Sequence, residues 1–177
     1  MLSIVILIVD TIATVLGGVL LLRFWMQAIR VRPPQPVAQF TFQLSDWLVR
    51  PLRRVVPGVG GYDWASLLGA FLIVLVATSV WFIAGASAQF VLLKALQRFL
   101  QWILYGFMAL LIIEAVFSWI NPHAPLAPFV RALNEPLLRP LRKVVPLVGG
   151  LDLTVLVALI LLQVALMVVS MLFGAPI

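Results

Sequence analysis

The chain has 177 residues, of which 64% are hydrophobic and 10% are charged, and its formal net charge is +6. Soluble domains are typically about 45–50% apolar and about 25% charged, so a soluble globular fold of this length is excluded, and lipid must solvate most of the chain. The absence of cysteine excludes disulfides and thiolate metal sites, and the single histidine, His123, excludes centres that need two imidazoles from one chain.

Four hydrophobic runs predict membrane-spanning helices, because about 20 residues of helix cross a ~30 Å hydrocarbon core. They cover residues 2–26, 64–86, 99–120 and 153–173. The first run lacks the basic start and the cleavage site of a secretory signal peptide, and Asp10 interrupts it, so we expect a retained helix. The sequence therefore predicts an all-α membrane protein with four transmembrane helices.

Two long loops and one short loop connect these runs, and their basic residues predict the topology. The long loops, residues 27–63 and 121–152, hold nine Lys or Arg residues, whereas the short loop, residues 87–98, holds two. Cytoplasmic loops carry the excess of Lys and Arg, so we expect both long loops in the cytoplasm and both termini on the outer side.

The two halves of the chain repeat one another. From Pro36 onward residues match at a constant offset of 89, so that R-P-L-R-R-V-V-P-G-V-G-G-Y-D (50–63) returns as R-P-L-R-K-V-V-P-L-V-G-G-L-D (139–152). Residues 1–86 and 99–173 thus form two tandem units of helix, loop and helix. Each unit has an even number of spans, so both insert the same way up, and their symmetry axis is expected along the membrane normal.

The doubled motif, preceded by L-x-R-F-W-M-Q in the first copy and F-S-W-I-N-P in the second, resembles the YggT (YlmG) family of small integral membrane proteins. The resemblance implies a multi-pass protein of the bacterial cytoplasmic (inner) membrane. Relatives have been linked to osmotic tolerance, to cell or plastid division and nucleoid distribution, and to cytochrome b assembly. No single molecular activity unites these roles, so the resemblance implies architecture more directly than function.

Each long loop contains an apolar stripe of helical period, which predicts an amphipathic helix. The stripes are Val37, Phe40, Leu44, Trp47 and Leu48 in the first copy, and Leu126, Phe129, Val130, Leu133 and Leu137 in the second. Such a helix lies in the membrane interface, docks on the bundle, or does both. We expect the chain to bend at Pro51 and Pro140, and Asp63 and Asp152 to cap the membrane helices that follow.

Six cations follow the stripes at equivalent positions of the two copies. They are Arg50, Arg53 and Arg54 in the first copy, and Arg139, Arg142 and Lys143 in the second. Generic attraction to anionic headgroups, at about 1 kcal/mol per residue, is one role for them. The other is a defined site for an anionic lipid or an acidic partner protein, because Arg binds phosphate in a bidentate manner.

Three ionisable residues, Asp10, Arg23 and Glu114, lie inside predicted spans. Arg23 aligns with Glu114 in the repeat, although the resemblance implies Arg at that point, so Glu114 is a departure from the family pattern. We hypothesise that the two form an ion pair across the pseudo-twofold axis, with snorkelling of Arg23 to the headgroups as the alternative. For Asp10 we favour a structural hydrogen bond to a neighbouring helix over a proton relay.

The sequence contains no catalytic constellation, metal-ligand spacing, phosphate loop or dinucleotide motif, so we expect neither an enzyme nor a cofactor. No nucleic-acid-binding module is present either, despite the high positive charge. Two functions remain. One is a membrane scaffold or assembly factor that binds anionic lipids or protein partners, with homo-oligomers possible. The other is a small ion transporter or channel component, since parallel repeats also occur in transporters.

Overall fold

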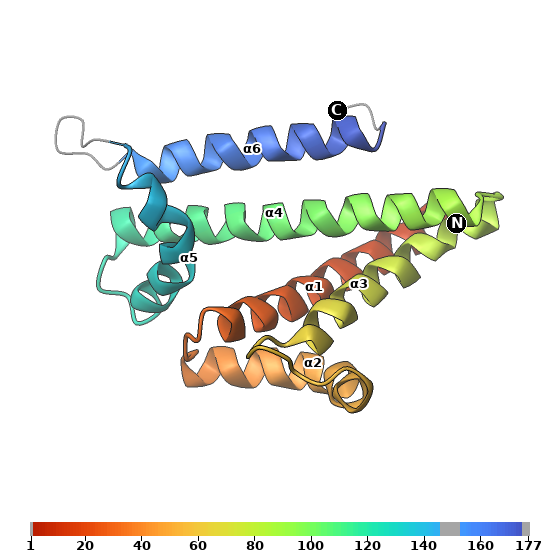
Figure 1. The fold of residues 1–177 in the computed structure, drawn as a ribbon, viewed down its shortest axis with the longest axis horizontal. Helices are drawn as coiled ribbons and strands as arrows, with labels where there is room; N and C mark the ends of the chain where they lie inside the picture. The colour runs from red at the N-terminus through yellow and green to blue at the C-terminus, as the bar shows by residue number, and fades with distance from the viewer. Residues whose placement is uncertain (1, 146–152, 175–177) are drawn as a thin grey trace.

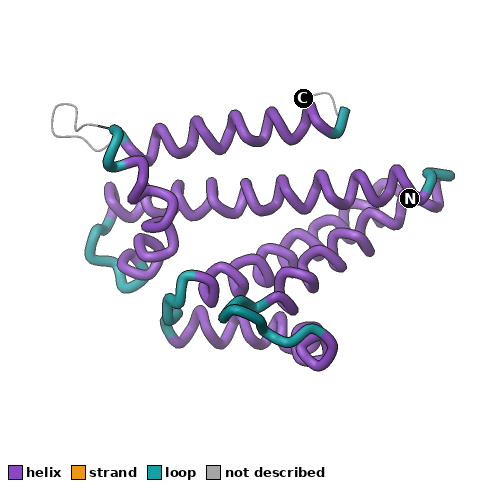
Figure 2. Tube along the Cα trace, in the orientation of Figure 1, coloured by secondary structure: helices purple, strands orange, loops and turns teal. Residues whose placement is uncertain are grey.

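The computed structural model describes residues 2–145 and 153–174, and within these ranges it contains six α-helices and one 3₁₀-helix (Figure 1, Figure 2). In chain order they are α1 (Leu2–Ala28), α2 (Gln35–Val55), α3 (Trp64–Ser79), η1 (Val80–Ala84), α4 (Ala88–Ile120), α5 (Ala127–Leu141) and α6 (Thr154–Leu172). Four apolar stretches are long enough to cross a membrane: α1, α3 continued by η1, α4 and α6. The predicted all-helical fold with four candidate spans is confirmed.

The long helices pack as two pairs. α1 lies along α3, and α4 lies along α6, while α4 also contacts the first pair. Figure 1 shows α4 close to α1 and α3 near its own start and diverging from them toward α5. The buried apolar residues accordingly form two separate clusters. One holds Leu20, Val49, Ala65 and Ala70, and the other holds Leu111, Leu138, Ala158 and Leu162.

The two shorter helices dock on these pairs. α2 packs against α1 and α3, and α5 packs against α4 and α6. On α2 the side chains of Thr41, Ser45 and Val49 are buried against the bundle, whereas Phe40 and Trp47 are exposed. In Figure 1, α2 and α5 lie away from the end where α1 starts and α6 finishes. The docking expected for these loop helices is therefore present, and the outer face of α2 keeps aromatic side chains exposed.

Prolines do not end the docked helices. α2 continues through Pro51 and α5 through Pro136 and Pro140. Figure 1 shows the last turns of α2 almost end-on, so this helix bends as predicted, because proline lacks an N–H and crowds the preceding turn. The chain after α2 turns at Gly60 and Gly61, whose φ angles of 69° and 84° suit glycine.

The predicted short loop over residues 87–98 is wrong. α4 begins at Ala88, and its first turn is capped by Ser87, whose Oγ accepts a hydrogen bond from the Phe90 N–H at 3.2 Å. The polar residues near Lys94 lower the hydropathy but do not interrupt a helix that is capped in this way. With 33 residues, α4 is about 50 Å long and exceeds the hydrocarbon thickness, so it extends past the membrane core.

Candidate functional site

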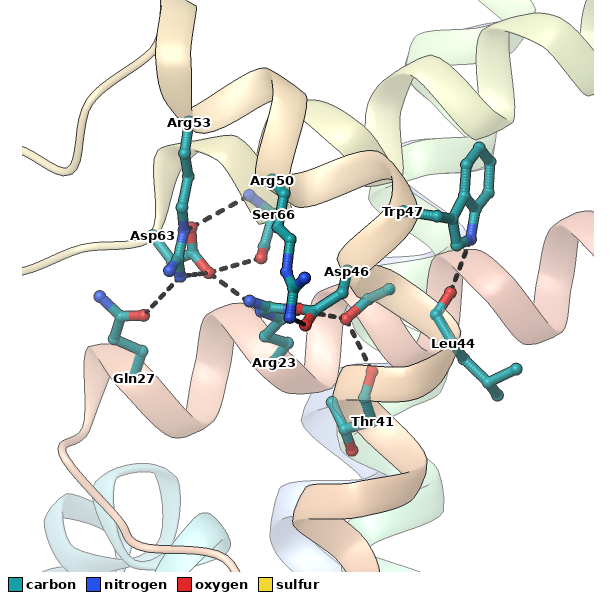
Figure 3. Close-up of polar contacts among 11 residues, drawn as sticks. Arg23, Gln27, Thr41, Leu44, Asp46, Trp47, Arg50, Arg53, Asp63 and Ser66 are labelled. Carbon is teal, nitrogen blue, oxygen red and sulfur yellow. Dashed lines mark hydrogen bonds and ion pairs between the residues drawn. The ribbon is translucent and has the colours of Figure 1, made fainter.

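Arg23 is the centre of a buried polar network that joins three helices. It lies near the end of α1 and is only 5% exposed. Its Nη1 donates to Asp46 Oδ1 on α2 at 2.7 Å and to the Ser45 hydroxyl, and its Nε lies 3.4 Å from Oδ2 of Asp63 (Figure 3). The guanidinium therefore connects α1, α2 and the start of α3.

Asp63 is the N-cap of α3, as predicted. Its carboxylate accepts hydrogen bonds from the Ser66 hydroxyl at 2.6 Å and from Arg53 Nη2 at 2.7 Å (Figure 3). Burial raises the pKa of this carboxyl, but the hydrogen bonds from Arg53 and Ser66 and the charges of Arg53 and Arg23 outweigh it and hold the pKa below its ordinary value of 3.8. The cap therefore also fixes Arg53 of the basic motif. The equivalent Asp152 lies outside the described residues.

Asp46 is a member of this network that sequence reasoning missed. Its second oxygen binds Arg50 Nη2 at 2.7 Å, one helical turn away on α2. The hydrogen bond from Arg23, with the charges of Arg23 and Arg50, lowers the pKa of Asp46 below 3.8 against the opposing effect of burial. An acidic residue four positions before Arg50, repeated as Glu135 in the second copy, was the signal that could have identified it.

The second half builds a different network around Glu114 on α4. Its Oε2 accepts a hydrogen bond from Asn134 Nδ2 of α5 at 2.7 Å, and its Oε1 lies 3.9 Å from Arg142 Nη2. Arg142 also binds Glu135 at 2.9 Å. By the offset of 89, Asn134, Glu135 and Arg142 are the counterparts of Ser45, Asp46 and Arg53. Equivalent positions thus surround a carboxylate here and a guanidinium in the first half.

The hypothesised Arg23–Glu114 ion pair is wrong in this structure. Arg23 is bound by the carboxylates of Asp46 and Asp63, and Glu114 is bound by residues of α5. Each loop folds back onto its own membrane helices, so local partners reach these charges before partners across the axis can. Snorkelling of Arg23 is also wrong, since its side chain is buried.

The six motif cations divide into two kinds. Arg50, Arg53 and Arg142 are held in ion pairs with carboxylates of their own half. Arg54, Arg139 and Lys143 are exposed, and among the described residues they have neither a hydrogen-bond nor an ion-pair partner. The second group is therefore available to an external anion, whereas the first group mainly positions the loop.

Asp10 is paired at the other end of the bundle. Its Oδ1 lies 2.8 Å from Arg98 Nη1, so α1 and α4 are joined by an ion pair there. The expected bond from Asp10 to a neighbouring helix is confirmed. Arg98, which follows one turn after Lys94, also lies over the ring of Trp102 at 5.4 Å. Arg98 therefore stabilises the contact between the two halves of the molecule.

Comparison with known proteins gives a consistent match. The CCB3/YggT family model matches residues 2–84 and 93–173. The chain is 31% identical over 165 residues to the uncharacterized protein YggT of Escherichia coli K12, covering 89% of this chain and 84% of that protein. It is 34% identical over 169 residues to an uncharacterized protein of Pseudomonas aeruginosa, covering 92% and 86%. No solved structure matches.

Proposed function

We propose that this chain, which belongs to the CCB3/YggT family, is a non-catalytic membrane scaffold or envelope-maintenance factor whose basic end binds anionic groups of lipids or partner proteins. The observation that carries the proposal is the division of the motif cations. Three form ion pairs with carboxylates of the same chain. Arg54, Arg139 and Lys143 are exposed and have no hydrogen-bond or ion-pair partner among the described residues. Exposed Arg and Lys side chains near a membrane surface attract anionic headgroups.

In this proposal the α2 and α5 end faces the cytoplasm of a bacterial inner membrane. The positive-inside rule supports that orientation, because nine of the twelve Lys and Arg residues lie in the two segments that contain these helices. Both helices then lie at the membrane interface, with exposed side chains such as Phe40 and Trp47 toward the headgroups. Two tandem units, each matching the family model, would present two basic motifs on one membrane face.

The buried network supports a scaffold with a fixed binding face. Asp46 of α2 pairs with Arg23 of α1, and Arg53 of α2 pairs with Asp63 at the start of α3, so the turn of α2 that bears Arg54 is anchored to two membrane helices. A site built on positioned helices pays less ordering entropy when it binds. The alternative of ion transport is less well supported, because Asp10 and Glu114, the acidic groups within the spans, are engaged by Arg98 and by Asn134.

The test compares two triple variants that remove the same charge. One is Arg54→Gln/Arg139→Gln/Lys143→Gln, and the control is Arg30→Gln/Arg32→Gln/Lys94→Gln. Each protein is reconstituted in nanodiscs of mixed phosphatidylglycerol and phosphatidylcholine, and the enrichment of phosphatidylglycerol is measured by mass spectrometry. At about 1 kcal/mol per cation, we expect the motif variant to lose most of the enrichment and the control to retain it.

Equal losses of phosphatidylglycerol enrichment in both triple variants would show that any three cations have the same effect, and would overturn the proposal of a defined site. Ion flux into proteoliposomes distinguishes the second function. If the protein is a scaffold, the proteoliposomes show no ion flux above that of protein-free vesicles. Ion flux that disappears in Asp10→Asn or Glu114→Gln would establish transport instead.

A further inference from the structure

The last candidate membrane helix, α6, carries a glutamine at its midpoint that faces outward. Gln163 lies equally far from both ends of Thr154–Leu172, and its side chain is exposed. Ile160 and Met167, one turn before and one turn after it, are 54% and 46% exposed. Among the described residues Gln163 has no hydrogen-bond partner. An unpaired amide therefore lies among apolar side chains that face the lipid.

The position of Gln163 excludes two ways of satisfying this amide. Each end of α6 is about 13 Å away at 1.5 Å per residue, so the side chain does not reach the headgroups or water. The carbonyl oxygens of a regular helix already accept hydrogen bonds from the next turn, and hydrocarbon offers neither donor nor acceptor. An unpaired polar group in such surroundings is costly. The amide therefore calls for a polar group from another membrane helix.

The first half shows what the corresponding position does when other helices cover it. By the offset of 89, Gln163 corresponds to Val74 of α3, which is fully buried. One turn later, the exposed Met167 corresponds to Thr78, which is also buried. α3 packs against α1, α2 and α4, whereas α6 packs against α4 and α5 and lies at the edge of the molecule (Figure 1). Within the described residues, the face of α6 that bears the amide is thus the one left uncovered.

We propose that α6 pairs with α6 of a second copy of this chain, and that the two Gln163 amides bind one another. Copies inserted in the same orientation are related by a twofold axis along the membrane normal, so a residue near that axis meets itself at the same depth. A carboxamide has donors and an acceptor, so Nε2 of each copy donates to Oε1 of the other. A different partner would need a polar side chain at this depth, whereas a second copy supplies it by symmetry. The homodimer goes beyond the proposed function and does not depend on it.

The residues around Gln163 suit a contact between two parallel helices. Leu156, Ile160, Gln163 and Met167 follow one another at spacings of four, three and four residues, which is the seam spacing of left-handed helix pairs. The three apolar members of this seam are exposed. A single amide within an apolar seam also fixes the register of the paired helices. The seam therefore supplies packing, and Gln163 supplies specificity.

Cysteine cross-linking tests the contact directly, because the chain has no cysteine of its own. Met167→Cys lies on the Gln163 side of α6. Leu161→Cys is the matched control, since Leu161 is 50% exposed and lies about 200° around the helix from Gln163, on the opposite side. Each protein is reconstituted in phosphatidylcholine vesicles, oxidised with copper–phenanthroline and analysed by non-reducing electrophoresis. We expect Met167→Cys to give a disulfide-linked dimer and Leu161→Cys to remain monomeric.

A second measurement isolates the amide. Wild type, Gln163→Leu and Gln163→Asn are labelled at the N-terminus with donor or acceptor fluorophores, and Förster transfer in vesicles gives the dimer fraction at each protein-to-lipid ratio. Gln163→Leu should need about tenfold more protein per lipid to reach the wild-type dimer fraction, whereas Gln163→Asn keeps an amide and should stay close to wild type. Because the side chain faces outward, all three proteins should unfold at similar temperatures.

Three results would overturn the homodimer. One is a wild type that stays monomeric at every protein density, since lipid alone would then cover α6. Another is equal transfer in wild type and Gln163→Leu, and the third is cross-linking through Leu161→Cys but not through Met167→Cys. If Gln163→Leu fails to fold, the two cysteine variants still decide, because both keep the amide.

Discussion

In the two halves of the molecule, side chains of opposite charge occupy equivalent positions at the centre of a polar network. In the first half a buried guanidinium, Arg23, is surrounded by two carboxylates, and in the second half the carboxylate of Glu114 is held by an amide and a more distant guanidinium. The first arrangement contains a buried ion pair, Arg23 with Asp63, and a partly exposed one, Arg23 with Asp46, whereas the second contains mainly a charge-assisted hydrogen bond. Buried pairs are costly to break, so the first half should depend on its central charge far more than the second.

Charge reversal should give the largest effect. Arg23→Glu would place a third carboxylate beside Asp46 and Asp63, and we expect a loss of about 3–5 kcal/mol or more in the free energy of unfolding, measured by denaturation in mixed micelles. Adding Glu114→Arg should not restore stability, because the two residues have separate partners. Recovery in the double variant would show that the charges meet across the axis and would contradict the networks described above.

Neutralising Arg23 and Glu114 one at a time should show how differently the two halves depend on their central charge. Arg23→Gln removes the shared cation of the buried Asp63 and the partly exposed Asp46, which keep only Arg53 and Arg50, and should cost about 3 kcal/mol. Glu114→Gln keeps an acceptor for the Asn134 amide and should cost about 1 kcal/mol, the usual contribution of a single hydrogen bond. Thermal unfolding followed by intrinsic tryptophan fluorescence measures both, and equal costs would mean that the halves do not differ in this way.

Acidification should weaken the first half through Asp46 and Asp63. Their pKa values are lowered below 3.8 in the folded protein, so below that value the unfolded carboxyls bind more protons than the folded ones. The stabilisation they provide is complete above about pH 4 and is lost as the pH falls through the folded pKa values.

Asp63→Asn isolates this contribution, because Asn also caps helices well. Unfolding measured between pH 6 and pH 3 should show a smaller acid loss in Asp63→Asn than in wild type. Parallel curves for the two proteins would mean that the carboxylate of Asp63 contributes nothing to the acid sensitivity.

The contrast between the halves also marks what the sequence could predict. The spans, the Asp63 cap and the bend at Pro51 follow from local rules of hydropathy, capping and proline geometry, and all were predictable. The start of α4 was not, because hydropathy places the helix end where polarity begins, whereas Ser87 caps the helix twelve residues before the predicted start of the span. Helix continuity depends on backbone hydrogen bonds rather than on polarity.

The partner of Arg23 could not be predicted from the repeat. Alignment gives equivalent depth for Arg23 and Glu114, but it says nothing about how each loop folds back on its own helices. Asp46 lies on a loop helix that also carries exposed residues, so its contact with a membrane helix appears only once α2 has docked. In a helix of this kind, the polar residues that become buried cannot be distinguished by type from the polar residues of its solvent-exposed face.

Substitution of Arg50 should have the smallest effect. It tests whether the network around Arg23 depends on its solvent-exposed members. The Arg50 side chain is 77% exposed and pairs with Asp46 one turn away, a geometry worth about 0.3–0.5 kcal/mol. Arg50→Gln should therefore change the free energy of unfolding by less than about 0.5 kcal/mol and should be insensitive to Glu114→Gln. A loss comparable to that of Arg23→Gln would mean that Asp46 is held from the outside, and that the buried guanidinium alone does not keep α2 on the bundle. The expected order, with Arg23 far above Arg50, places the stability of the first half in the groups that water does not reach.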